Sequence, residues 1–269
     1  KPTRKQIWTI AYPILISLLM ENMIGLTDTA FLGRVGEVEL GASALGSVYY
    51  LVIFMLGFGF GIGAQILIAR RNGEKAYALI GPLFQQGLLF LLSLATVMFV
   101  ISHTFTPMVL RSLISSDEVY EAAVSYTNWR VFGFFFAFVA IMFRAFFVGI
   151  TNTKTLTLNS IVMVLSNVVL NYVLVFGKLG LPAMGIAGAA IASSASEMIS
   201  MVFFIVYTRL RIDHRKYGLF RFAGFSSKLL RGMLNVSVWT MIQMFVAMGM
   251  QTMIKAPVMA VWAVIKIVN

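Results

Sequence analysis

The chain has 269 residues, of which 59% are hydrophobic and only 12% are charged. A water-soluble domain of this length would need more polar surface, so the composition excludes one. Cysteine is absent, which excludes disulfides and thiolate metal sites. The net charge of +11 would by itself also suit a protein that binds nucleic acid.

Long apolar runs divide the sequence into candidate membrane helices, each near the length of about 20 residues that crosses a bilayer. The first run has no small-residue cleavage pattern and is too long for a signal sequence, so we expect it to be retained. A seventh run starts near Leu229. The sequence therefore predicts an all-α membrane protein. Its six complete predicted spans are 7–31, 47–69, 83–101, 131–150, 155–176 and 186–207.

Basic residues gather on alternate segments between these spans. With the N-terminus inside, the cytoplasmic segments hold fifteen of the twenty-one Lys and Arg residues, seven of them between Arg209 and Arg231, whereas Arg130 falls in an outer segment. This is the positive-inside bias that orients membrane helices, and a surface for nucleic acid would not be sorted in this way. We therefore expect a multi-pass protein with a cytoplasmic N-terminus and no nucleic-acid partner. Three acids and two histidines are expected in loops: Asp117, Glu118, Glu121, His103 and His214.

The spans and loops predict three regions. We expect residues 1–207 to form a six-helix transmembrane lobe and residues 208–228 a basic cytoplasmic loop. Residues 229–269 would then hold the start of a seventh helix and an atypical tail.

Asp28 lies near the end of the first span, and Glu21 precedes it by seven residues, which puts both carboxyl groups on one helical face. An acid at the bilayer centre costs about 2.5–3.5 kcal/mol. The acidic face must therefore meet protein, water or a bound cation, and carboxyl groups at membrane depth usually mark an ion or proton pathway. The sequence predicts a transporter in which Asp28 exchanges a proton or Na⁺, with Glu21 as a further candidate.

Four glycines mark the second span at alternate positions: Gly57, Gly59, Gly61 and Gly63. Gly59, Gly61 and Ala64 have the spacing of a dinucleotide-binding fingerprint, but that motif needs a strand, a turn and a helix, whereas these residues share one apolar run. Pairs four residues apart are instead steps that let neighbouring membrane helices approach closely. We therefore predict close helix packing along this span.

Phenylalanines are concentrated in the fourth predicted span, with five between Phe132 and Phe138. Their rings could line a cavity for flat organic cations through cation–π contacts. Helix packing and lipid contact are the commoner roles of such a cluster.

Polar residues follow helical spacing in the fifth and sixth spans. Asn167 and Asn171 are four residues apart and share a face, and Ser193 and Glu197 do the same in the next span. These side chains could join neighbouring helices by hydrogen bonds worth about 0.6–2 kcal/mol each. They could also line a polar cavity opposite Asp28, and both roles can hold together. Glu197 could face that cavity, or it could pair with an arginine or water beside a neighbouring span.

Three segments carry longer patterns. Residues 28–36 read Asp-Thr-Ala-Phe-Leu-Gly-Arg-Val-Gly, and residues 144–153 read Arg-Ala-Phe-Phe-Val-Gly-Ile-Thr-Asn-Thr. The longest pattern is Asn167-x-x-x-Asn171-Tyr172-x-x-x-Phe176-Gly177-x-x-Gly180-x-Pro182-x-x-Gly185-x-x-Gly188-Ala189-Ala190-x-Ala192-Ser193. Together they resemble the NorM-like branch of the multidrug and toxic compound extrusion (MATE) family, over about residues 7–243.

The resemblance implies the N-terminal lobe of a two-lobed transporter, with the C-terminal lobe missing. It implies an antiporter in the plasma (inner) membrane that exports amphipathic, often cationic, drugs in exchange for Na⁺ or H⁺, without a cofactor. Asp28 matches the first-helix acid that binds the coupling ion. Asn167, Asn171 and Ser193 match the hydrogen-bonding positions around it, and an Asn rather than an Asp at position 171 leaves less charge there. No position of the family can be transferred to Glu21.

Two alternatives stay open. A flippase for lipid-linked saccharides would need a basic cavity for pyrophosphate, and Arg144 is the only candidate that the predicted spans offer. The chain could instead be an inactive half-transporter, since its tail departs from the family at Lys255, Pro257 and Lys266. An enzyme is not expected, because no nucleophile–base constellation or metal-ligand spacing stands out.

Overall fold

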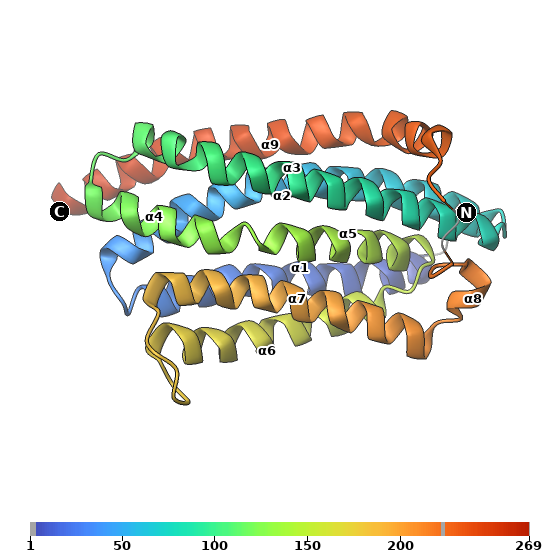
Figure 1. Ribbon diagram of the computed structural model, residues 1–269, viewed down its shortest axis with the longest axis horizontal. Coiled ribbons are helices and arrows are strands. Elements are labelled where there is room, and N and C mark those ends of the chain that lie inside the picture. The colour runs from blue at the N-terminus through green and yellow to red at the C-terminus, as the bar shows by residue number, and fades with distance from the viewer. Residues whose placement is uncertain (1–3, 222–223, 269) are drawn as a thin grey trace.

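The computed structural model describes the backbone of residues 4–221 and 224–268 and most of their side chains; the side chains of 4–7, 9–10, 14, 17–18, 21–22, 248–249 and 251–268 lie outside the description. Long helices run side by side in this part of the chain (Figure 1), and none of it is a strand. The elements are α1 (Arg4–Leu32), α2 (Glu37–Gly73), η1 (Tyr77–Leu79), α3 (Ile80–Leu113), α4 (Asp117–Arg130), α5 (Gly133–Gly149), α6 (Lys154–Phe176), α7 (Gly185–Arg211), α8 (His214–Tyr217) and α9 (Ser227–Val268).

The predicted all-α transmembrane bundle is confirmed. Among the described residues, five helical stretches are long and apolar enough to cross a bilayer: α2, Tyr77–Leu113, α6, α7 and Ser227–Ala247 of α9. The pair of α4 and α5 makes a sixth if it is one span, with a bend of 47° between its halves. Helix α1 has 29 residues and is therefore about 43 Å long. The connection between α7 and α9 runs from Ile212 to Ser226 and contains α8.

The segment before the fourth predicted span is a helix, not a loop. Asp117 and Glu118 lie in the first turn of α4, where acids interact favourably with the helix dipole, and Asp117 also pairs with Arg111. Helix α4 is too polar to stand out by hydropathy, which explains the wrong prediction. The residues that were expected in loops and lie in helices are Asp117, Glu118, Glu121, His103 and His214.

The glycines of α2 let two different helices approach it. A Cβ atom on Gly57 would lie 2.6 Å from the Phe138 ring of α5, and Gly61 faces α5 in the same way. A Cβ atom on Gly59 would lie 2.6 Å from the Cα of Met241 in α9, and one on Gly63 would lie 2.8 Å from the Cα of Ser237. The predicted close packing is confirmed, with α2 between α5 and α9.

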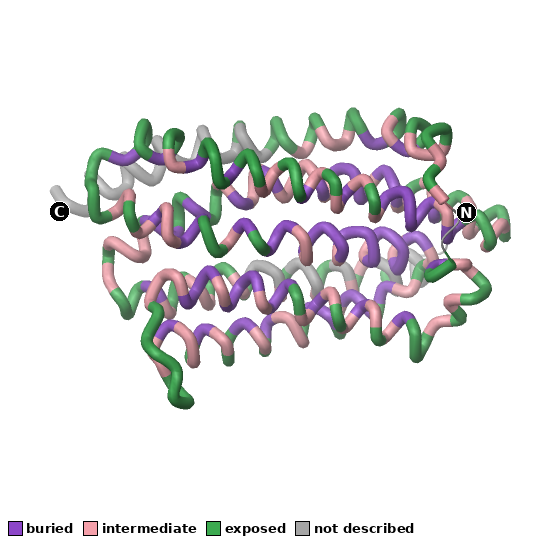
Figure 2. The backbone as a smooth tube through the Cα atoms, viewed as in Figure 1, coloured by how far each residue is buried: buried purple, intermediate pink, exposed green. Residues whose placement is uncertain are grey.

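The core lies along the middle of the bundle, where α5 is buried over most of its length (Figure 2). Phe134, Phe138 and Phe146 are fully buried there. Phe134 stacks on Tyr50 of α2, with ring centroids 4.7 Å apart. The phenylalanines of this helix therefore serve mainly to pack it against its neighbours.

The substitution Gly63→Ala should destabilise the bundle by about 1–3 kcal/mol, because its methyl group would force α9 away from α2. The measurement is thermal unfolding of the purified chain in detergent, followed by circular dichroism. Gly73→Ala is the matched control, since a Cβ atom at this end of α2 meets nothing within 4 Å. Equal melting temperatures for the two variants would contradict the described α2–α9 contact.

Candidate functional site

Asp28 is one turn from the end of α1 and is half-buried against α6 and α7. Its Oδ1 accepts a hydrogen bond of 2.7 Å from Asn171 Nδ2 of α6. Its Oδ2 accepts another of 2.7 Å from Ser193 Oγ of α7. The carboxylate therefore faces other helices of the bundle, and three helices meet at it.

The two asparagines of α6 extend this network. Asn171 Nδ2 also donates to Asn167 Oδ1 at 3.1 Å, and Asn167 Nδ2 donates to Ser193 Oγ at 3.3 Å. Both asparagines are fully buried. The structure thus brings together the four polar residues that the sequence singled out: Asp28, Asn167, Asn171 and Ser193.

One acceptor in this network has no donor. The Oδ1 atom of Asn171 is buried and lacks a hydrogen-bond partner among the described residues. Reversing the amide would place this oxygen against the Asp28 carboxylate, so the orientation with Nδ2 toward Asp28 is the favourable one. An unpaired buried acceptor costs about 1–3 kcal/mol. Carboxylate and amide oxygens are the ligands that hard cations prefer, so these residues fit a small cation.

A buried ion pair lies close to this network. Arg130, at the end of α4, donates to both carboxylate oxygens of Glu197 in α7, at 2.7 and 3.0 Å. The Arg130 guanidinium also lies 3.5 Å from the centroid of the Tyr50 ring, and the Tyr50 hydroxyl donates to Glu197 at 2.9 Å. Glu197 therefore pairs with an arginine, which was one of its two predicted roles.

Arg130 was expected in an outer segment, and the structure places it at the last residue of α4 with a side chain that is only 12% exposed. Sequence reasoning missed it as a site residue. Its partner Glu197 was visible as an acid within an apolar span, and such an acid needs a buried cation or a proton. Arg130 supplies this cation, but it lies in the polar helix α4, where the sequence predicts a loop.

Helix α7 also supports the break between α4 and α5. A helix end leaves carbonyl groups without intrahelical donors. Ser194 Oγ donates to two of them at the end of α4, Trp129 O at 3.2 Å and Arg130 O at 3.3 Å. Gly133 begins α5, and a Cβ atom there would collide with Glu197 and Arg130. One turn of α7 therefore contacts both Asp28 and the break.

A second polar contact joins α6 and α7. Asn159 Nδ2 of α6 donates a hydrogen bond of 2.9 Å to Ser200 Oγ of α7. Glu21 belongs to α1, but its side chain lies outside the described residues. The same holds for Lys255, Pro257 and Lys266 in the tail, where the backbone continues as α9.

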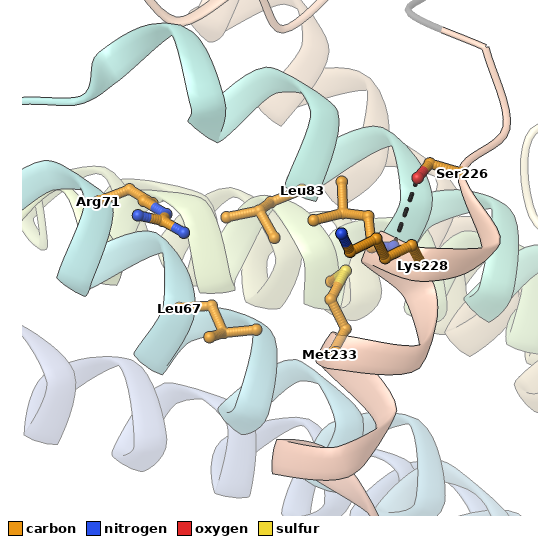
Figure 3. Close-up of a pocket in the computed structure, with 8 residues that line it drawn as sticks. Leu67, Arg71, Leu83, Ser226, Lys228 and Met233 are labelled. Atoms are coloured by element: carbon orange, nitrogen blue, oxygen red, sulfur yellow. Dashed lines mark hydrogen bonds between the residues drawn. The ribbon is translucent and has the colours of Figure 1, made fainter.

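A cavity of about 450 Å³ opens at the other end of the bundle, between α2, α3 and the start of α9 (Figure 3). Its walls include Leu67, Leu83 and Met233, and two cationic residues, Arg71 and Lys228, line it as well. Arg71 is paired with Glu74, which offsets part of this positive charge. The cavity lies at the other end of the bundle from Asp28, so the two are separate, and the residues that line it include no acid that would attract a cationic compound.

The substitution Asn171→Ala should lower the stability of the chain by about 1–3 kcal/mol, because Asp28 and Asn167 would each lose a donor. The measurement is again thermal unfolding in detergent. Ser166→Ala, on the same helix, removes only a local bond to Val162 O and should change stability by less than about 0.5 kcal/mol. A smaller loss for Asn171→Ala than for Ser166→Ala would contradict the described network.

Curated relatives of the chain are bacterial multidrug resistance proteins. It is 26% identical over 217 residues to the probable multidrug resistance protein NorM of Mannheimia succiniciproducens, covering 80% of this chain and 46% of the relative. It is 30% identical over 213 residues to the probable NorM of Synechocystis sp., covering 78% and 46%. The chain therefore spans about half the length of the curated relatives it matches.

Solved structures share the fold. A multidrug resistance MATE family transporter of the MOP superfamily, in an outward-facing conformation, matches with a TM-score of 0.77 and 22% identity over 89% of this chain and 52% of that one. A MOP superfamily transporter from Pyrococcus furiosus matches with the same TM-score and 20% identity, over 89% and 52% of the two chains.

A family model provides the assignment. The model for MatE matches residues 13–173, which include Asp28, Asn167 and Asn171. Because this match covers more than half of the 269 residues, the chain belongs to the MatE family of multidrug and toxic compound extrusion transporters.

Proposed function

We propose that this chain takes part in the export of amphipathic, often cationic, compounds in exchange for Na⁺ or H⁺. The membrane would be the plasma (inner) membrane, with the N-terminus in the cytoplasm, as the distribution of basic residues favours. The names of the relatives support multidrug export. The single observation behind the proposal is the Asp28 carboxylate, which α6 and α7 hold by two hydrogen bonds of 2.7 Å.

The chemistry of Asp28 suits a group that binds and releases a cation. A carboxylate away from water costs free energy in its charged form, and a bound proton or Na⁺ would remove that charge. After release, the donors Asn171 Nδ2 and Ser193 Oγ stabilise the anion. When Asp28 is neutralised by a proton or Na⁺, the Asn171 amide can reverse, and its unpaired Oδ1 would then accept a hydrogen bond from the protonated acid or serve as an oxygen ligand for Na⁺.

Helix α1 is suited to respond to this exchange. It packs mainly on α6, while Leu26 and Met23 on its outer face are 69% and 45% exposed. When the charge of Asp28 is neutralised, its hydrogen bonds to α6 and α7 weaken, because charged acceptors bind donors more strongly. We therefore infer that cation binding lets α1 bend or shift relative to α6, which would move the exported compound.

The flippase alternative gains no support from the arginines within the spans. Arg130 is neutralised by Glu197. Arg144 lies 5.6 Å from the centroid of the Phe58 ring and has further interactions of its own. Neither offers an uncommitted positive charge for pyrophosphate.

The substitution Asp28→Asn should abolish export while leaving membrane insertion intact, because the amide cannot carry the exchangeable charge. The measurement is ethidium efflux from proteoliposomes that contain the chain, driven by an imposed Na⁺ gradient or pH gradient. Comparing the two gradients identifies the coupling ion. The matched control is Asp117→Asn at the exposed start of α4, which should keep the wild-type rate.

Two outcomes would contradict the proposal. Undiminished efflux by Asp28→Asn would show that another group exchanges the cation. Failure of the wild-type chain to move the dye under either gradient would favour the half-transporter that lacks activity of its own.

A further inference from the structure

A permanent positive charge lies close to the candidate cation site. Ser193 of α7 donates to Asp28, and Glu197, one turn further along the same face of α7, holds the Arg130 guanidinium, so this charge lies about one helical turn from the Asp28 carboxylate. Arginine does not lose its proton in proteins, so this charge is present throughout any exchange cycle. A cation that binds Asp28 must therefore do so beside a guanidinium, which is itself an excellent partner for a carboxylate.

Glu197 both neutralises and holds that guanidinium. Two hydrogen bonds, at 2.7 and 3.0 Å, fix Arg130 in the fork geometry that suits a carboxylate. The Tyr50 ring covers the guanidinium at 3.5 Å, and the Tyr50 hydroxyl lies 2.9 and 3.0 Å from the same two oxygens of Glu197. The missing side chain at Gly133 leaves the room that this arrangement needs.

We propose that Glu197 is a positioning residue for cation binding: it holds and neutralises Arg130, which would otherwise compete with the cation for the Asp28 carboxylate. This inference rests on the proposed function, since it presupposes a cation at Asp28. It adds a second acid that acts without touching the cation.

Apart from Asp28 and Glu197, the described residues around the site are neutral and do not neutralise Arg130. Tyr50 of α2 contacts both members of the pair, and the buried Tyr126 of α4 has its hydroxyl hydrogen-bonded to Ser47. Helix α6 contributes the amides Asn167 and Asn171, and α7 contributes Ser193. Among the described residues around the site, Glu197 is thus the acid that pairs with Arg130.

A purely structural role is the competing explanation, because the pair also joins α7 to the break between α4 and α5. The two explanations differ for a double substitution. If Arg130 competes for Asp28, then removing Arg130 should reverse the effect of removing Glu197. If the pair only supports the break, then removing both partners should be at least as harmful as removing one.

The experiment measures cation binding by the purified full chain in detergent through its tryptophan fluorescence, for which Trp129 lies next to Arg130. Na⁺ is titrated at fixed pH, and H⁺ is titrated in Na⁺-free buffer. Binding is counted only as the change in fluorescence that the Asp28→Asn variant no longer shows. Glu197→Gln should raise the half-saturating cation concentration about three- to tenfold, with the full signal still reached. Arg130→Gln/Glu197→Gln should return it to within about twofold of the wild type, since the competing guanidinium is removed together with its partner.

Glu118→Gln is the matched control, because it removes the same charge from an exposed position of α4 and should change nothing. An unchanged half-saturation in Glu197→Gln would overturn the inference, as would a double variant that binds as weakly as the single one. If the wild type gives no Asp28-dependent signal with either cation, cation binding itself is refuted and the inference fails with it. Binding without dye efflux would refute only the export activity of this chain.

Discussion

The hydrogen bonds from α6 and α7 to the Asp28 carboxylate are the interaction on which the rest of the site depends. A charged group can remain within a membrane bundle only where other protein groups replace water around it. Asn171 and Ser193 do so from two different helices, and Asn167 orients both of them. The position of α1 is therefore tied to the charge on a single side chain.

Helix α7 has a larger part in this arrangement than its sequence suggests. Within one and a half turns it presents Ser193 to Asp28, Ser194 to the end of α4, and Glu197 to Arg130. A small shift of α7 would alter all three contacts at once. The helix thus connects the candidate cation site to the bend between α4 and α5.

The residues around Asp28 could be predicted because each breaks an apolar pattern at helical spacing. An acid or an asparagine pair within a membrane-length run has few explanations, and the resemblance to a family supplied the same residues. Helix α4 and Arg130 could not be predicted, because hydropathy alone does not distinguish a polar helix beside a membrane span from a loop. The pairing of Glu197 with Arg130 depends on a tertiary contact across 67 residues, which local spacing does not show.

Helix α2 has two faces lined by glycines, one with Gly57 and Gly61 and the other with Gly59 and Gly63. Helix α5 lies against one glycine face of α2 and α9 against the other, and an added Cβ atom on either face would meet the neighbouring helix. The three helices are therefore packed more closely than side chains on α2 would allow. Helix α1 differs from them, because Leu19, Met23 and Leu26 on its outer face are exposed among the described residues, and the turn at residues 33–36 joins it to α2.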